Sequence, residues 1–178
     1  MRFGLAVLSL TIVATCANAV PAWAVASCDG FTAALRSGAS DLGVDFSRAV
    51  VVSRARSDAT VFDVTTRAEV DGTLSCKGDE FLHFEARISQ PANGRTTTNF
   101  DRFQAAALHA ALGWDAGKSK GILRGLNSDA REFLEASRQR GDVYIAGKTE
   151  EHEPGGVSLG MIATDSDMTF VIVGPAGQ

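Results

Sequence analysis

The chain has 178 residues, of which 45% are hydrophobic and 21% are charged, and its formal net charge is −4. This length suits one ordinary domain with a proper hydrophobic core. The acidic balance argues against nucleic acid or an anionic membrane surface as a partner, because phosphate binding needs concentrated Lys and Arg.

The first residues have the layout of a secretory signal peptide. Arg2 is followed by an apolar run over residues 5–14, which is too short to cross a hydrocarbon core of ~30 Å. We expect cleavage after Ala24, with Ala19 as an alternative, so that residues 1–24 are removed and residues 25–178 form a single α+β domain. A lipoprotein attached through Cys16 is disfavoured, because Thr15 stands where a smaller residue is usual.

Two cysteines remain after this cleavage, Cys28 and Cys76. In an oxidising compartment such a pair is most simply a disulfide. A redox or metal-binding pair is the alternative, but it would favour a C-x-x-C spacing that the chain lacks. We therefore expect a structural disulfide in a periplasmic or secreted protein.

The residues that follow predict a helix and then an antiparallel meander. Ser27 or Asp29 can cap a helix that ends near Gly43, and three consecutive valines lie in a strand over residues 49–56. Residues 60–70 alternate between apolar and polar side chains. Asp71-Gly72 is a strong hairpin signal, so we expect residues 73–76 to pair back on residues 67–70.

A second alternating stretch, residues 82–88, defines the candidate site. Its polar side chains, with two more from the preceding strand, are expected on one face of the sheet: His83, Glu85, Arg87, Arg67 and Glu69. Such a face can form the floor of a ligand site, with His83 as an acid or base. The same alternation is also ordinary for a solvated face with cross-strand charge pairs.

Two helices are expected next. Residues 91–98 predict a polar linker, and Thr98 or Asn99 can cap a helix that carries one apolar stripe. A second helix is expected over residues 119–140, with a possible restart at Ser128. Its apolar side carries Ile122, Leu126, Ala130, Phe133 and Ser137. Gly117-Lys118-Ser119 resembles the end of a phosphate-binding loop, but the spacing is one residue short and a helix precedes it.

Strands are expected over residues 143–148, 157–164 and 168–173. Between the first two lies the acidic stretch Glu150, Glu151, His152 and Glu153. One histidine with flexible glutamates is a weak metal site, and Pro154-Gly155-Gly156 favours a solvated loop. His109 is expected on the surface of its helix.

Together these features predict an exported, soluble α+β protein. Its antiparallel sheet combines an N-terminal meander with C-terminal hairpin strands, and two or three amphipathic helices cover one face. The chain has no G-x-S-x-G or H-E-x-x-H motif, so we expect no metal or other cofactor. We expect a non-enzymatic binding or accessory module for a periplasmic partner or small ligand. The alternatives are a periplasmic enzyme that uses the His83, Glu85 and Arg87 row, and a structural or secretion-associated envelope component.

Overall fold

The computed structural model describes residues 27–41, 51–54, 60–66, 69–142, 146–153 and 156–175. Within them the elements are α1 (Cys28–Asp41), β1 (Val51–Arg54), β2 (Val61–Thr65), β3 (Asp71–Lys77), β4 (Glu80–Ser89), α2 (Gly94–Leu112), α3 (Ala116–Arg140), β5 (Ala146–His152), β6 (Ser158–Thr164) and β7 (Asp167–Val173). The predicted signal peptide and the expected strand residues 143–145 lie outside these ranges.

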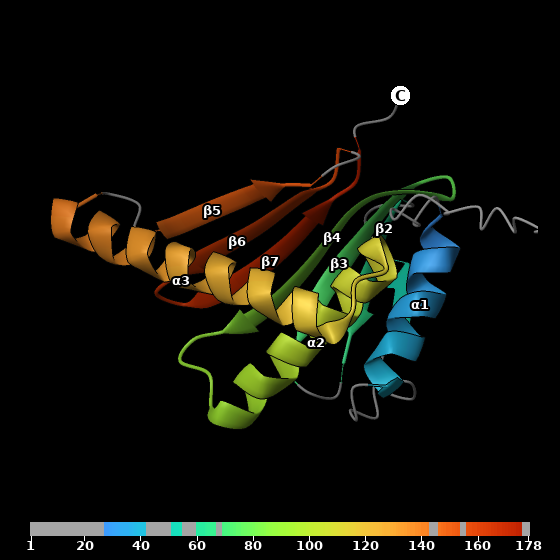
Figure 1. Ribbon diagram of the computed structural model, residues 1–178, viewed down its shortest axis with the longest axis horizontal. Helices are drawn as coiled ribbons and strands as arrows, with labels where there is room; N and C mark the ends of the chain where they lie inside the picture. The colour runs from blue at the N-terminus through green and yellow to red at the C-terminus, as the bar shows by residue number, and fades with distance from the viewer. Residues whose placement is uncertain are drawn as a thin grey trace, which may run out of the picture.

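The strands form one antiparallel sheet with the order β1-β2-β3-β4-β7-β6-β5 (Figure 1). Strands β1 to β4 make a meander, and β5 to β7 make a second one. The two meanders meet where β7 pairs with β4. The structure therefore confirms the predicted α+β class.

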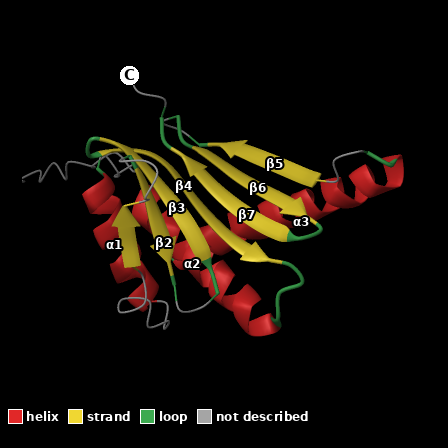
Figure 2. Cartoon of the chain, turned by 180° about the vertical axis from the view of Figure 1, so that it is seen from behind, coloured by secondary structure: helices red, strands yellow, loops and turns green. Residues whose placement is uncertain are grey.

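The helices lie on one face of this sheet and leave the other face open, as the two opposite views show (Figures 1 and 2). Helix α2 contacts β4 and α1, and α3 contacts β5 and β6. The core between the layers is rich in phenylalanine. The ring of Phe84 lies 5.1 Å from that of Phe31 and 5.8 Å from that of Phe103. None of the helices in the described ranges is long and apolar enough to cross a membrane.

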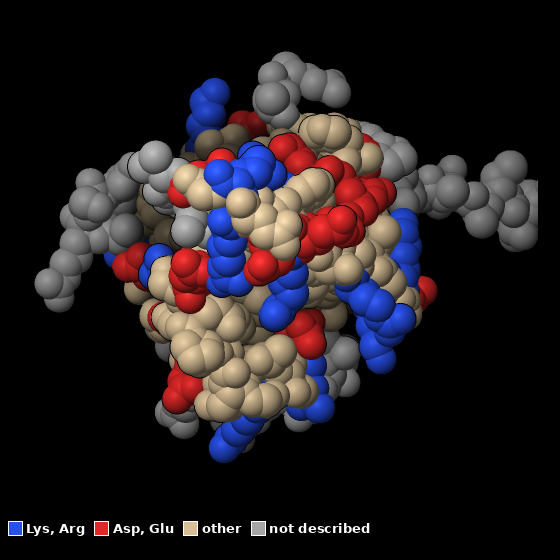
Figure 3. All heavy atoms as spheres, turned by 90° about the vertical axis from the view of Figure 1, so that its left-hand side faces the viewer, with Lys and Arg blue, Asp and Glu red and all other residues tan. Residues whose placement is uncertain are grey.

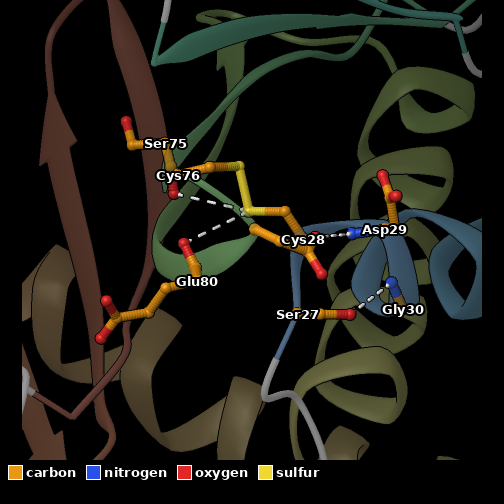
Figure 4. The surroundings of a disulfide bond; sticks show 8 residues. Ser27, Cys28, Asp29, Gly30, Ser75, Cys76 and Glu80 are labelled. Atoms are coloured by element: carbon orange, nitrogen blue, oxygen red, sulfur yellow. Dashed lines mark hydrogen bonds between the residues drawn. A yellow bond between two sulfur atoms is a disulfide. The ribbon is translucent and has the colours of Figure 1, made fainter.

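Helix α1 is joined to the sheet by the Cys28–Cys76 disulfide, whose cysteines are 48 residues apart (Figure 4). The Cys28 and Asp29 amides also donate hydrogen bonds to the backbone and side-chain oxygens of Asp79, over 2.7 and 3.1 Å. Ser27 caps the helix, because its hydroxyl oxygen accepts a hydrogen bond from the Gly30 amide. The predicted disulfide and the predicted Ser27 cap are both confirmed.

The two longer helices begin earlier than expected. Helix α2 starts at Gly94, because the Asn93 side chain accepts a hydrogen bond from the Thr96 amide. The prediction of a polar linker over residues 91–98 was therefore wrong for residues 94–98, which are helical. Helix α3 is capped by Asp115 and runs to Gly141 without a restart at Ser128.

The predicted buried side of α3 is confirmed at Leu126, Ala130 and Ser137 but is wrong at one residue. Phe133, expected on the buried stripe, is 51% exposed. The neighbouring Leu134 is buried in its place, together with Leu123, Leu126 and Ala130. The stripe follows the surface of β5 and β6, which the helix crosses, and this path cannot be read from α3 alone.

The prediction of a hairpin turn at Asp71-Gly72 was wrong. Both residues lie in β3, opposite Thr65 and Val64 of β2. The turn comes earlier, where Glu69 has a φ of 59°. Gly72 is needed in the strand for a packing reason, because a Cβ there would lie 2.4 Å from the backbone oxygen of Glu85.

The acidic stretch is also strand rather than loop. Glu150, Glu151 and His152 belong to β5, the edge strand, and pair with Gly160, Leu159 and Ser158 of β6. Charged side chains on an edge strand discourage pairing with other chains. The stretch therefore has a structural reason for its charge.

Helix α3 lies almost directly on the backbone of β5 at Gly147. A Cβ at this position would be 1.8 Å from the carbonyl oxygen of Ala130 and 2.3 Å from the amide nitrogen of Leu134. Only glycine allows the helix and the strand to approach this closely.

Candidate functional site

Strand β4 carries the predicted polar row on the open face of the sheet. Phe84, Ala86 and Ile88 are buried. His83, Glu85 and Arg87 alternate with them and therefore point to the opposite face, which none of the described helices covers (Figure 2). The structure thus brings these three predicted residues together on adjacent positions of one face.

His83 and Glu85 are in contact. The Nε2 atom of His83 lies 3.2 Å from Oε1 of Glu85, and both side chains are partly exposed. The hydrogen bond from His83 lowers the pKa of the Glu85 carboxyl, against the effect of burial, and the charges of His83 and Arg87 act in the same direction. Glu85 is therefore held as a carboxylate at neutral pH.

The residues across from this row differ from those expected. Ser75, Thr73 and Asp71 of β3 lie opposite His83, Glu85 and Arg87, respectively. Glu69 lies instead in the β2–β3 turn, where its carboxylate accepts a hydrogen bond from the Thr96 hydroxyl of α2 over 2.8 Å. Arg67 is outside the described residues.

A hollow of about 450 Å³ lies on this open face. The polar side chains that line it come from four neighbouring strands: Asp63, Thr65, Asp71, Thr73, Glu85, Arg87 and Thr169. His83 is not among them. Glu85 and Arg87 therefore belong both to the predicted row and to the lining of the hollow.

Part of this hollow was predictable from local alternation. Asp63 and Thr65 belong to the polar side of an alternating stretch, so they were expected on this face. Asp71 was missed because it was assigned to a turn, and Thr169 because its strand pairs with β4 over a long sequence distance. Register between distant strands is not visible in local alternation.

The hollow has an excess of negative charge. Three carboxylates, Asp63, Asp71 and Glu85, face one guanidinium, that of Arg87. In the described part of the chain, Arg87 has no carboxylate within 4.0 Å, although its charge acts on Glu85. The described residues contain no group of three or more His, Cys, Asp or Glu side chains arranged to hold a metal ion.

One strand, β6, separates this hollow from the polar side chains of β5. Glu150 is in register with Gly160 of β6, Val171 of β7 and Glu85 of β4, so all four positions share the open face. His152 Nδ1 lies 2.8 Å from the Ser158 hydroxyl oxygen. Glu151 lies on the other face, so the four-residue acidic stretch does not converge on one point.

The end of the molecule at β5 and α3 carries both signs of charge. Acidic and basic side chains lie next to one another in this view, and neither sign covers it (Figure 3). Two ion pairs contribute, Lys148 with Glu150 and Arg138 with Glu135. This mixed surface lacks the continuous basic patch that binds nucleic acid.

The other residues that were considered as possible functional residues have structural roles. His109 is exposed and its Nδ1 lies 2.9 Å from the carbonyl oxygen of Trp114, so it closes the α2–α3 connection. Lys118 lies 3.7 Å from the centre of the Trp114 ring, and Ser119 is fully buried. Gly117-Lys118-Ser119 is thus part of the first turn of α3, where the loop before the helix was expected.

Comparisons with protein-family models, curated proteins and solved structures found no match for this chain.

Proposed function

We propose that the chain is an exported, non-enzymatic binding module that holds a small, amine-bearing ligand in the hollow on the open sheet face. The observation that carries this proposal is the composition of the hollow, where three carboxylates face one guanidinium within about 450 Å³. This volume is within the range of ~300–1,000 Å³ that small-molecule sites occupy.

The charges of the hollow define the ligand. Asp63, Asp71 and Glu85 favour an ammonium group, because charge-assisted hydrogen bonds to carboxylates are the stronger ones. Arg87 offers a donor for an anionic or carbonyl group on the same ligand. The hydroxyls of Thr73 and Thr169 can donate to or accept from its polar groups.

Binding accounts for this geometry better than catalysis does. Ser75 lies opposite His83, which contacts Glu85, so a hydroxyl, an imidazole and a carboxylate occupy one region. Catalysis of this kind requires the base to be hydrogen-bonded to the nucleophile. The described residues show no hydrogen bond between the Ser75 hydroxyl and His83, and His83 is outside the hollow.

Titration calorimetry with 1,4-diaminobutane tests the proposal. The diamine should bind the mature protein, whereas 1,4-butanediol, which has the same chain without charge, should not. Asp71→Asn and Glu85→Gln should each weaken binding about tenfold, which corresponds to ~1.4 kcal/mol for the loss of one charged contact. Glu132→Gln, which changes an exposed carboxylate of α3, should bind like the unmodified protein.

The proposal fails if the diamine and the diol bind with the same affinity. It also fails if Asp71→Asn, Glu85→Gln and Glu132→Gln all bind the diamine equally well. Thermal unfolding of each variant checks that the sheet is intact.

Export rests on the disulfide, because such bonds persist in oxidising compartments. Mass and thiol analysis of protein from the cell envelope tests this part. It should find a chain that starts near Val25 and has no free thiol. Two reactive thiols would contradict export.

A further inference from the structure

A second hollow lies between α2 and α3, on the opposite side of the sheet from the first. It is a groove of about 450 Å³. The residues that matter for its chemistry are Asp101, Arg102 and Ala105 of α2, and Lys120, Leu123 and Arg124 of α3. The groove forms where α3 leaves α2 to lie across β5 and β6.

The floor of the groove is apolar. Ala105 is half-buried and contributes only a methyl group, so the two helices leave space between them. Leu123 is 5% exposed and its side chain closes the bottom. An alkyl chain placed here would leave water for an apolar surface, and each methylene group that it buries favours binding.

The rim of the groove is basic. Arg102, Lys120 and Arg124 are exposed, and in the described part of the chain none of them has a carboxylate within 4.0 Å. The single acidic residue is Asp101, whose pKa is raised by burial against the attraction of Arg131 and Lys120. The groove therefore combines an apolar floor with an excess of positive charge at its edge.

We propose that the α2–α3 groove binds a free fatty acid, with its carboxylate at Lys120, Arg102 and Arg124 and its alkyl chain over Ala105 and Leu123. Charge complementarity selects an anionic head group, and the apolar floor selects a tail. This site is independent of the hollow on the open face and takes a ligand of opposite charge.

Titration calorimetry with dodecanoate, below the concentration at which it forms micelles, tests this proposal. Dodecanoate should bind at one site. Dodecanol and dodecylammonium have the same chain without the anionic head and should bind at least tenfold more weakly. Octanoate should also bind more weakly, because it buries fewer methylene groups.

Substitutions inside and outside the groove test whether dodecanoate binds there. Lys120→Gln and Arg124→Gln, both at exposed positions, should each weaken dodecanoate binding about tenfold. Ala105→Leu should fill the floor and weaken it further. Arg95→Gln removes an exposed charge from α2 outside the groove, and Asp71→Asn alters the open sheet face; both should leave dodecanoate binding unchanged.

Three results would overturn the proposal. These are no binding of dodecanoate, equal binding of dodecanoate and dodecylammonium, and equal affinity in the groove variants and in Arg95→Gln. Because Asp71→Asn serves as a control here, failure of this site can be distinguished from failure of the amine site.

Discussion

At the scale of single residues, Glu85 connects the open face with the stability of the fold. Its pKa lies below the ordinary value of 4.5, chiefly because His83 donates a hydrogen bond to its carboxylate. A carboxyl group with a lowered pKa stabilises the folded state above its ordinary value, and this contribution is lost as the pH falls through the lower, folded value. The side chain is partly exposed, so the contribution is small.

We therefore predict that Glu85→Gln lowers the free energy of unfolding at pH 7 by about 0.5 kcal/mol. The difference from the unmodified protein should disappear as the pH falls through the lowered, folded pKa and the glutamate becomes protonated. Urea unfolding at pH 7 and pH 3 measures this. The contact with His83 would be irrelevant to stability if the loss were the same at both pH values.

At Asp101 the pH dependence of stability should have the opposite sign. Burial raises the pKa of its carboxyl, and the charges of Arg131 and Lys120 offset this only in part. A raised pKa favours the folded state at low pH, and this benefit is lost as the pH rises through the folded value. Asp101→Asn should therefore increase stability slightly at pH 7 and leave it unchanged at pH 3. Thermal unfolding at the two pH values checks this, and a loss of stability at pH 7 would contradict it.

At the scale of elements, the contact between α3 and β5 depends on Gly147. A single methyl group there would overlap the α3 backbone at Ala130 and Leu134. Backbone atoms cannot move aside as a flexible side chain can, so the helix must shift.

Gly147→Ala should lower the free energy of unfolding by about 2 kcal/mol or more, because overpacking typically costs ~1–3 kcal/mol. Gly125→Ala is the matched control, since nothing lies within 4 Å of its added Cβ in the middle of α3. It should increase stability by about 0.5–1 kcal/mol. Urea unfolding of both variants measures these changes in stability. Equal effects of the two substitutions would mean that the close approach of α3 to β5 does not require glycine at position 147.

The elements also show which features of the fold are readable from sequence. The alternation of β4 and the stripe of Phe100 and Phe103 in α2 follow local periodicity, so they were predicted correctly. Asp71-Gly72 and the acidic stretch around Glu150 look like turns and loops locally. Their strand conformation depends on pairing with β2 and β4 in the first case and with β6 in the second, and local sequence does not show this pairing.

At the scale of the whole molecule, the candidate site also combines residues that local sequence identifies with residues that it does not. His83, Glu85 and Arg87 were found because they lie two residues apart on one strand. The hollow needed the register of β2, β3 and β7 as well, which the chain sets through the core and not through any local signal.

The disulfide acts at this scale, because it ties the first helix to the sheet across 48 residues. Replacing both Cys28 and Cys76 with Ser should lower the free energy of unfolding by about 2–4 kcal/mol. Helix α1 should remain in place through its contacts with α2. Urea unfolding of the double variant and of the reduced protein should agree; a change below 1 kcal/mol in both would refute a stabilising role.

Strand β7 is the last of the described strands and also the one that joins the two meanders. Without it, β4 and β6 would each present a row of unpaired backbone groups, and such edges invite proteolysis or pairing with other chains. Both meanders therefore depend on a single strand to protect an edge, and the sheet is continuous only when β7 is in place.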